Sequence, residues 1–234
     1  MPTSPRTTAT IRPMQPADLE FATACTLAEG WHSETRFEFE GYYQHAPGGC
    51  LLAAVGDQRV GICIATPYGW AGFIGELIVL KEWRGQGIGR ALLQAAIAYL
   101  HRQGAHSIYL DGVASAVPFY ERMGFRKICR SLRFGGIIQG QAHLGARRMC
   151  PADLDAVARL DQQVFGADRR FFLARRLAQL PEHAIVLPDG ESVAGFLLCR
   201  PVANGFSVGP WIAREDMPRP LDLLEALAAP FGSL

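Results

Sequence analysis

The sequence lacks the features that mark several broad classes of protein. It has almost no charge imbalance, because 23 basic and 22 acidic residues leave a net charge of +1 over 234 residues. Without an excess of positive charge there is no field to attract nucleic acid or an anionic membrane, so we expect neither partner. No apolar run approaches the ~20 residues that a membrane-spanning helix needs. The first residues, MPTSPR, precede no apolar stretch, so we expect no secretory signal peptide.

Paired cysteines are also missing. The six cysteines stand singly, without a Cys-x-x-Cys pair, and neither they nor the histidines have metal-ligand spacing. We therefore expect no metal. Most of the cysteines lie in apolar runs, as Cys63 does, which is typical of small buried side chains in a reducing, cytoplasmic protein. Nothing in the sequence supports a nucleophilic cysteine, and nothing in it indicates the oligomeric state.

What the sequence does have is an internal repeat. Residues 12–20 recur at 147–155, with six of the nine identical. In both copies a short strand is followed by Pro-Ala-Asp, which suits a first helical turn because proline fits there and aspartate complements the positive end of a helix. Apolar runs at 60–65 and 193–198, each after a turn of Gly and Asp, add a β-hairpin to both halves. We infer two related α/β units.

The first half alternates strands and helices. The patterns predict helices at 16–29, within 33–45, at 87–103 and at 116–123. They predict strands at 10–14, 50–55, 60–66, 71–80 and 107–111, with further strand segments from Phe125. A strand, a helix and a strand in succession from 71 to 111 imply one parallel pair in a mixed sheet.

The most informative segment joins the apolar strand at 71–80 to the helix at 87–103. It reads Arg-Gly-Gln-Gly-Ile-Gly-Arg over residues 84–90. Glycines let backbone amides approach a ligand, and the first amides of a helix are unpaired and carry the positive end of its dipole. Together they form a cradle for phosphate oxygens, to which Arg84 and Arg90 add charge.

Other interpretations of this loop fit less well. One alternative is that residues 84–90 are an ordinary glycine-rich connection with surface arginines, and the sequence does not exclude it. A P-loop requires Gly-Lys-Ser/Thr, which is missing. A dinucleotide-binding loop requires glycine where Arg90 stands, although Asp111 at the next strand end would suit a ribose.

Two motifs in order resemble the GNAT superfamily of N-acetyltransferases. Residues 84–89 match its Arg-x-x-Gly-x-Gly signature, and residues 116–125 resemble its A-x-x-F-Y-x-x-x-G-F segment. The resemblance covers roughly residues 10–133. The asparagine common in the family would fall at Val113, so that contact is absent here.

The resemblance implies a mixed α/β fold in which the central parallel strands, 71–80 and 107–111, splay apart around acetyl-CoA as cofactor. In the family, backbone groups of the first strand pair with the pantetheine arm, here Leu77, Ile78 and Val79. The pyrophosphate would be held by the loop and the start of the helix, namely Arg84, Gly85, Gln86, Gly87, Ile88, Gly89 and Arg90.

The implied reaction is direct attack of a neutral amine on the thioester, which needs a base and an acid. Glu76 is the candidate base, since an ionisable group inside an apolar strand is costly without a task or a partner. A carboxylate paired with an arginine or turned to solvent is the alternative. Tyr120 is the candidate acid by its motif match, and a packed core tyrosine is the alternative.

The acceptor amine would bind between the first two helices, where the resemblance points to Trp31, His32 and Glu34. Each of these residues is, taken alone, also consistent with an ordinary surface or packing role. In the second half, residues 165–170 and 208–211 either help to shape the acceptor pocket or serve as core and solvated helix face.

The second half loses the cradle. At the corresponding place, residues 215–220 read Glu-Asp-Met-Pro-Arg-Pro, in which two prolines remove backbone donors and two acids would repel phosphate. We therefore predict a GNAT domain at 1–134, a linker at 135–146, and a degenerate, incomplete GNAT-like domain at 147–234 that does not bind acetyl-CoA.

The sequence leaves three hypotheses for the function of this protein. The leading hypothesis is an acetyl-CoA-dependent N-acetyltransferase acting on a primary amine of a small molecule or a peptide. The second is a non-catalytic acyl-CoA-binding sensor or regulatory module. The third is a nucleotide-binding module, against which Arg90 already counts.

Overall fold

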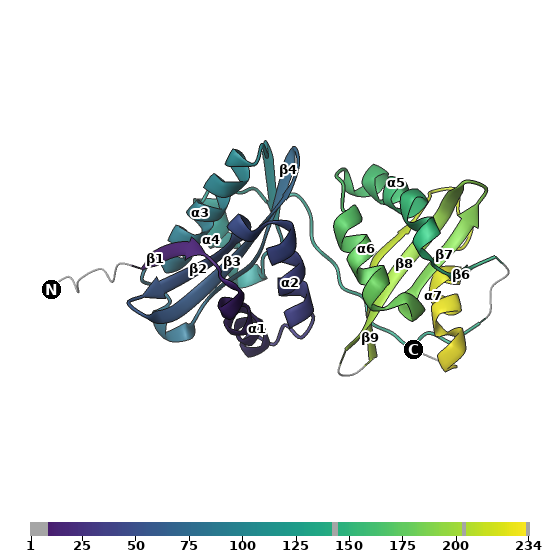
Figure 1. The fold of residues 1–234 in the computed structure, drawn as a ribbon, viewed down its shortest axis with the longest axis horizontal. Coiled ribbons are helices and arrows are strands. Elements are labelled where there is room, and N and C mark those ends of the chain that lie inside the picture. The colour runs from purple at the N-terminus through teal and green to yellow at the C-terminus, as the bar shows by residue number, and fades with distance from the viewer. Residues whose placement is uncertain (1–8, 142–144, 203–204, 233–234) are drawn as a thin grey trace, which may run out of the picture. The chain divides into compact units, whose positions relative to one another are not determined.

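The computed structural model describes residues 9–141, 145–202 and 205–232, and the chain divides into two compact units, residues 1–132 and 133–234 (Figure 1). Residues 142–144 of the predicted linker lie outside the described residues. So do residues 1–8 of the predicted first domain and residues 203–204 and 233–234 of the predicted second. The two units are described one at a time.

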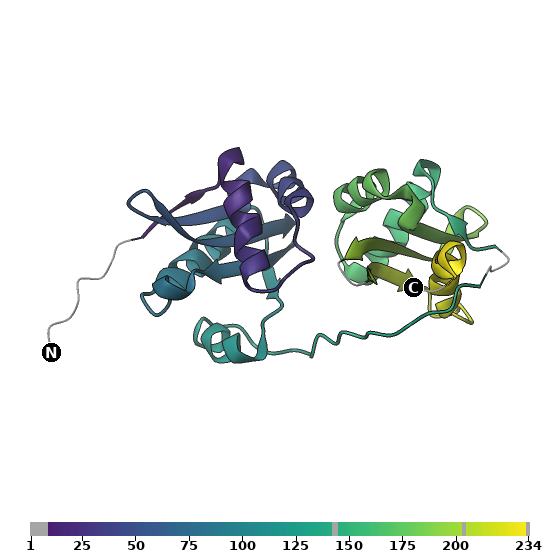
Figure 2. The same cartoon turned by 90° about the horizontal axis from the view of Figure 1, so that it is seen from below.

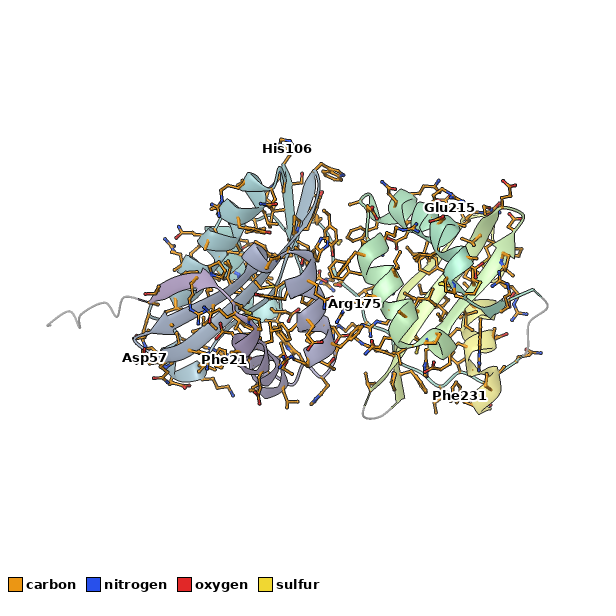
Figure 3. All side chains as sticks on the ribbon, viewed as in Figure 1. Phe21, Asp57, His106, Arg175, Glu215 and Phe231 are labelled. Carbon is orange, nitrogen blue, oxygen red and sulfur yellow. The ribbon has the colours of Figure 1, made fainter. Side chains whose placement is uncertain are left out.

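Unit 1 is built on a five-stranded mixed sheet. Its strands lie in chain order and are β1 (Thr10–Pro13), β2 (Cys50–Val55), β3 (Gln58–Tyr68), β4 (Ala71–Val79) and β5 (Ser107–Leu110). Neighbours are antiparallel except β4 and β5, which are parallel. Asp57, labelled in Figure 3, stands at the tight turn between β2 and β3. The predicted parallel pair inside a mixed sheet is thus confirmed.

Helices cover both faces of this sheet (Figures 1 and 2). On one face lie α1 (Leu19–Ala28) and α2 (Arg36–His45), whose apolar side chains, among them Phe39, pack against Ile62 and Ile78. On the other face lie α3 (Ile88–Arg102) and α4 (Val117–Arg122), and the apolar stripe of α3 packs against Ile74. Two buried cores on either side of one sheet hold β4 in the middle of the unit.

The repeated Pro-Ala-Asp turns form the same local structure in both units. The Asp18 carboxylate accepts hydrogen bonds from the Gln15 N–H at 2.8 Å and from Arg12 at 2.7 Å, and the Arg59 Nε donates to it at 2.6 Å. In unit 2, Asp153 accepts from the Cys150 N–H at 2.8 Å and from the guanidinium of Arg147, 2.7 Å away. A carboxylate at this position caps the entry to the helix, which explains why the sequence pattern recurs.

Unit 2 has a four-stranded sheet in which all neighbours are antiparallel. Its strands are β6 (Arg147–Arg148), β7 (Ala184–Asp189), β8 (Ser192–Val202) and β9 (Gly205–Ala213), in that order. One face packs against α5 (Leu154–Phe165) and α6 (Arg170–Gln179), and the other against α7 (Leu221–Ala228). Within the described residues, unit 2 has no strand equivalent to β5.

One sequence prediction about unit 1 was wrong. Strand segments were expected from Phe125, but in the described residues between Leu110 and Arg147 no strand forms. Phe125 packs into the core under α4, and the chain beyond it is largely exposed, with Phe134 92% exposed. A strand needs a neighbouring edge to satisfy its backbone groups, and local sequence does not supply one.

Candidate active site

A β-bulge interrupts β4 at Glu76. Ile78 pairs with Ile62 and Gly75 pairs with Ile64, so Glu76 and Leu77 together face the single residue Cys63. Glu76 has a φ of +49°, a left-handed conformation that costs a side-chain-bearing residue on the order of 1 kcal/mol. The extra residue also shifts which face the strand presents, because Ile74 packs toward α3 whereas Ile78 packs toward α1.

The Glu76 carboxyl is partly buried, and it interacts electrostatically with Glu34 of the loop between α1 and α2. Burial, followed by the negative charge of Glu34, raises the pKa of Glu76 to about 7. Glu34 is held in place from two sides, since its carbonyl accepts from the buried Thr26 hydroxyl at 3.1 Å and its carboxylate accepts from Ser33 at 2.7 Å. A carboxyl group with a pKa near 7 suits a proton acceptor at neutral pH.

The two parallel strands separate beside the bulge. β4 pairs with β5 only from Ala71, opposite Ser107, to Ile74, opposite Leu110, and then continues to Val79. Within the described residues, no strand pairs with this side of β4 beyond Ile74. The edge of Leu77, Ile78 and Val79 that faces away from β3 therefore has no strand partner among the described residues, as a pantetheine-like arm would require, and on it the Val79 carbonyl accepts a hydrogen bond from the Arg84 Nε at 2.8 Å.

The glycine loop gives α3 an open N-terminus. Gly85 and Gly87 have φ values of +77° and +86°, and no atom lies within 4 Å of where a Cβ would stand on either. Gly87 is the N-cap of α3 and provides no side-chain cap. Among the described residues, no acceptor bonds the backbone N–H groups of residues 85–90. Unpaired donors at the positive end of a helix, with free space before them, fit a diphosphate.

The charged and polar side chains of this loop point to different partners. Arg84 donates from its Nε to the Val79 carbonyl at 2.8 Å and forms an ion pair with Glu29 at 2.5 Å. Gln86 donates to the Glu82 carbonyl at 3.3 Å. Arg90 is exposed in the first turn of α3, while the Ile88 side chain is buried and anchors that turn in the core.

Tyr120 belongs to α4 and packs against the core on the α3 face of the sheet. Its ring packs between Phe119 and Phe125, with ring centroids 5.2 and 6.1 Å away. Burial, followed by the proximity of Cys63, raises the pKa of Tyr120, so its hydroxyl keeps its proton at neutral pH. Gly112 makes room for this ring, because a Cβ there would lie 2.8 Å from Tyr120 Cε2.

The structure thus brings together some of the predicted site residues and separates others. Glu76 and Glu34 interact electrostatically, and so do Tyr120 and Cys63, the residue opposite Glu76 in the sheet. Trp31 packs against the core under α1, and His32 is exposed. Sequence reasoning missed Tyr42, whose pKa is raised by burial, by Glu34 and by Glu76, since nothing in the sequence pattern set this tyrosine apart.

Unit 2 repeats the bulge without its carboxylate. Leu197 pairs with Trp211 and Cys199 pairs with Val208, which leaves Gly209 and Pro210 of β9 opposite one residue of β8. Glycine therefore stands where unit 1 has Glu76. After β9 the chain passes through Glu215, labelled in Figure 3, to α7, whose N-cap is Pro220. The carboxylate at the bulge and the glycine loop are both replaced in this unit.

The described residues offer neither a metal-binding cluster nor a membrane-spanning helix. Among the described residues, no group of three or more His, Cys, Asp or Glu side chains is placed to hold a metal ion. In the same residues, every helix is too short or too polar to cross a membrane.

Two family models match the chain. One, described as the Acetyltransferase (GNAT) family, matches residues 16–125, and the other, the Acetyltransferase (GNAT) domain, matches residues 157–230. The matches fall in unit 1 and in unit 2 respectively.

The chain is also similar to acyltransferases and acetyltransferases among curated proteins and solved structures. Holothin acyltransferase of Pseudoalteromonas sp. is 24% identical over 209 residues, covering 87% of this chain and 69% of that protein. N-alpha-acetyltransferase 30 of Schizosaccharomyces pombe is 39% identical over 66 residues, 27% of this chain and 44% of its own length. A GCN5-related N-acetyltransferase from Sphaerobacter thermophilus superimposes with a TM-score of 0.60 at 17% identity, covering 97% of this chain and 82% of that one. At such identity the structural likeness shows a shared fold.

Proposed function

Because the chain belongs to the GNAT acetyltransferases and carries two GNAT domains in tandem, we propose that unit 1 transfers an acetyl group from acetyl-CoA to a primary amine of a small molecule or a peptide. The observation that carries this proposal is the combination at the end of β4. A strand edge that no other described strand pairs with leads into a loop whose amides at residues 85–90 have no acceptor among the described residues. Both features fit the arm and the diphosphate of a coenzyme A ester.

Different residues of unit 1 would serve different steps of such a transfer. Bound acetyl-CoA supplies the thioester that the amine attacks. The amides of residues 85–90 bind the diphosphate, and the backbone of residues 77–79 orients the arm. The Glu76 carboxylate accepts a proton from the incoming ammonium, since its pKa of about 7 leaves a large basic fraction at neutral pH. The Tyr120 hydroxyl holds the proton that the departing sulfur needs.

The similar proteins do not define one chemical class of acceptor. Their names are holothin acyltransferase, N-alpha-acetyltransferase 30 and glucosamine 6-phosphate N-acetyltransferase, which point to chemically different acceptors. The acceptor class proposed for this chain is therefore a primary amine, placed beside the loop that carries Trp31, His32 and Glu34.

For unit 2 we propose a supporting role without acetyl-CoA. Gly209 replaces the carboxylate at the bulge, and prolines and acids replace the glycine loop, so neither the base nor the anion site is present there. Residues 135–146 are assigned as the linker between the two domains.

Titration calorimetry with acetyl-CoA tests this function directly. The wild type is expected to bind one acetyl-CoA per chain, and the absence of binding would overturn the proposal. Turnover is then measured across a panel of primary amines by chromatography of the CoA product, because the exposed Cys129 and Cys150 thiols would react with a thiol reagent. Binding without transfer or hydrolysis across the panel would instead support the non-catalytic sensor.

A further inference from the structure

Arg84 is the first residue of the glycine loop, and its side chain turns away from that loop. Its Nε donates to the carbonyl of Val79 at 2.8 Å, and its Nη2 donates to Oε1 of Glu29 at 2.5 Å. Both ends of the guanidinium are thus engaged, one with the last residue of β4 and one with the end of α1. The side chains of Arg84 and Glu29 are 47% and 26% exposed, so the pair lies at the surface of unit 1.

Glu29 begins the loop that leads from α1 to α2. It is the C-cap residue of α1, where the negative end of the helix dipole disfavours a carboxylate unless a cation lies nearby. The same helix end holds the rest of the loop. The Trp31 N–H donates to the Thr26 carbonyl at 2.9 Å, and the Thr26 hydroxyl donates to the Glu34 carbonyl at 3.1 Å. Glu29 and Glu34 are therefore the two ends of one anchored loop.

We propose that Arg84 is a positioning residue that ties the loop at residues 29–35, and with it Glu34, to the end of β4. In this role its guanidinium fixes the acceptor side of the site and does not hold the diphosphate. The proposal rests on the function proposed above, which makes this loop the acceptor side and the glycine loop the cofactor side.

The arrangement accounts for both contacts of Arg84. A half-exposed ion pair contributes little to stability by itself, so the pair is poorly explained as a stabilising device. A planar guanidinium that bonds a carboxylate and a carbonyl in two directions instead fixes their relative position. The carbonyl belongs to the strand that carries Glu76, and the carboxylate belongs to the loop that carries Glu34, so the contact sets the geometry between these two groups.

Hydrogen exchange of the intact protein without ligand tests the anchoring step. Arg84→Gln and Glu29→Gln are each expected to speed amide exchange at residues 30–35 by about fivefold, and the double variant to add nothing further, because both remove one contact. Glu20→Gln removes the same charge from an exposed position on α1 and is expected to leave exchange unchanged. Unchanged exchange in Arg84→Gln would overturn the proposal.

Calorimetry with acetyl-CoA separates this role from diphosphate binding. Arg84→Gln and Glu29→Gln are expected to shift the Kd for acetyl-CoA by less than about twofold, whereas Arg90→Gln, in the open first turn of α3, weakens binding by about fivefold. A tenfold loss on Arg84→Gln without a loss on Glu29→Gln would show that Arg84 binds the diphosphate. If the wild type binds no acetyl-CoA, the proposed function fails, but the exchange experiment still decides whether Arg84 holds the loop.

Steady-state kinetics of Arg84→Gln and Glu29→Gln, with an amine that the wild type acetylates, test the effect on the acceptor side. Both variants are expected to raise the KM for the amine by about fivefold while the KM for acetyl-CoA stays the same. Arg84→Lys keeps a cation near Glu29 and is expected to recover part of the loss. A change confined to the KM for acetyl-CoA would contradict a positioning role.

Discussion

Glu76 of β4 lies opposite the buried Cys63 of β3 at the point where the register of the two strands shifts. Burial, followed by the charge of Glu76, raises the pKa of the Cys63 thiol far above its usual range, so Cys63 stays neutral and is a poor nucleophile. Glu76 in turn is partly buried, and the charge that acts on it from the described residues is the negative charge of Glu34. The bulge therefore leaves the carboxyl group of Glu76, and not the thiol, as the group able to exchange a proton near neutral pH.

Replacing Glu76 by glutamine removes the proton acceptor and keeps the shape of the side chain. The Glu76→Gln variant is expected to lose about 10²- to 10⁴-fold in kcat, the usual contribution of a general base. Its Kd for acetyl-CoA should remain that of the wild type, because the diphosphate amides lie at residues 85–90. Steady-state kinetics and calorimetry measure the two quantities. A variant with wild-type turnover would remove Glu76 from the mechanism.

The pH dependence of the rate tests whether the charge of Glu34 raises the pKa of Glu76. The base works when it is deprotonated, so kcat/KM is expected to rise with pH and to level off above about 7. Glu34→Gln removes a negative charge that disfavours ionisation of Glu76, so the midpoint is expected to move to lower pH. Glu20→Gln, which removes an exposed carboxylate elsewhere in unit 1, should leave the midpoint unmoved. Identical profiles for Glu34→Gln and the wild type would contradict the coupling.

Tyr120 is expected to act only in the chemical step. Tyr120→Phe keeps the ring that packs between Phe119 and Phe125, so folding and acetyl-CoA binding should persist. Loss of the proton donor is expected to lower kcat by about 10²-fold. If kcat is unchanged while thermal stability falls, Tyr120 is a packing residue.

Gly87 and Gly104 form a matched pair for testing the glycine loop. Their φ values are +86° and +89°, and neither has an atom within 4 Å of a built Cβ. Alanine at either position is therefore expected to cost on the order of 1 kcal/mol of stability through backbone strain. Gly87→Ala should in addition weaken acetyl-CoA binding by about tenfold, because it reorients the amides at the start of α3. Gly104→Ala, at the far end of α3, should bind as the wild type does.

The repeated aspartates predict how each unit responds to acid. For Asp18, burial by itself would raise the pKa, but Arg12, the Gln15 N–H and Arg59 outweigh it and hold the pKa at about 2. Arg147 holds the pKa of Asp153 at about 2 as well. Since both folded pKa values lie below the usual 3.8, the stability that each carboxylate adds is present above pH 3.8 and is lost as the pH falls toward about 2.

Substitution should reveal the difference between these two positions. Asp18→Asn is expected to cost about 3 kcal/mol at pH 7, because this carboxylate is 1% exposed and has two arginine partners. Asp153→Asn, with one arginine partner, should cost about 1 kcal/mol. Calorimetric unfolding between pH 2 and 7 measures both, and each deficit relative to the wild type should shrink toward pH 2. A constant deficit across this range would contradict the ion-pair origin.

By itself, the sequence determined the features that depend on local pattern. The apolar spacing of α3, the glycines before it and the Pro-Ala-Asp turns of both halves each act within a few residues, so their structure could be predicted without knowing what packs against them. An ionisable residue in an apolar strand also singled out Glu76 directly.

Tertiary structure alone decided the register of β3 against β4, the direction of Arg84 and the absence of a strand after Phe125 in the described residues. Each of these depends on a partner far away in the chain. A bulge exists only relative to the strand it faces, and a guanidinium takes whichever acceptors the fold brings within reach. Backbone groups pair only with an edge that long-range packing provides.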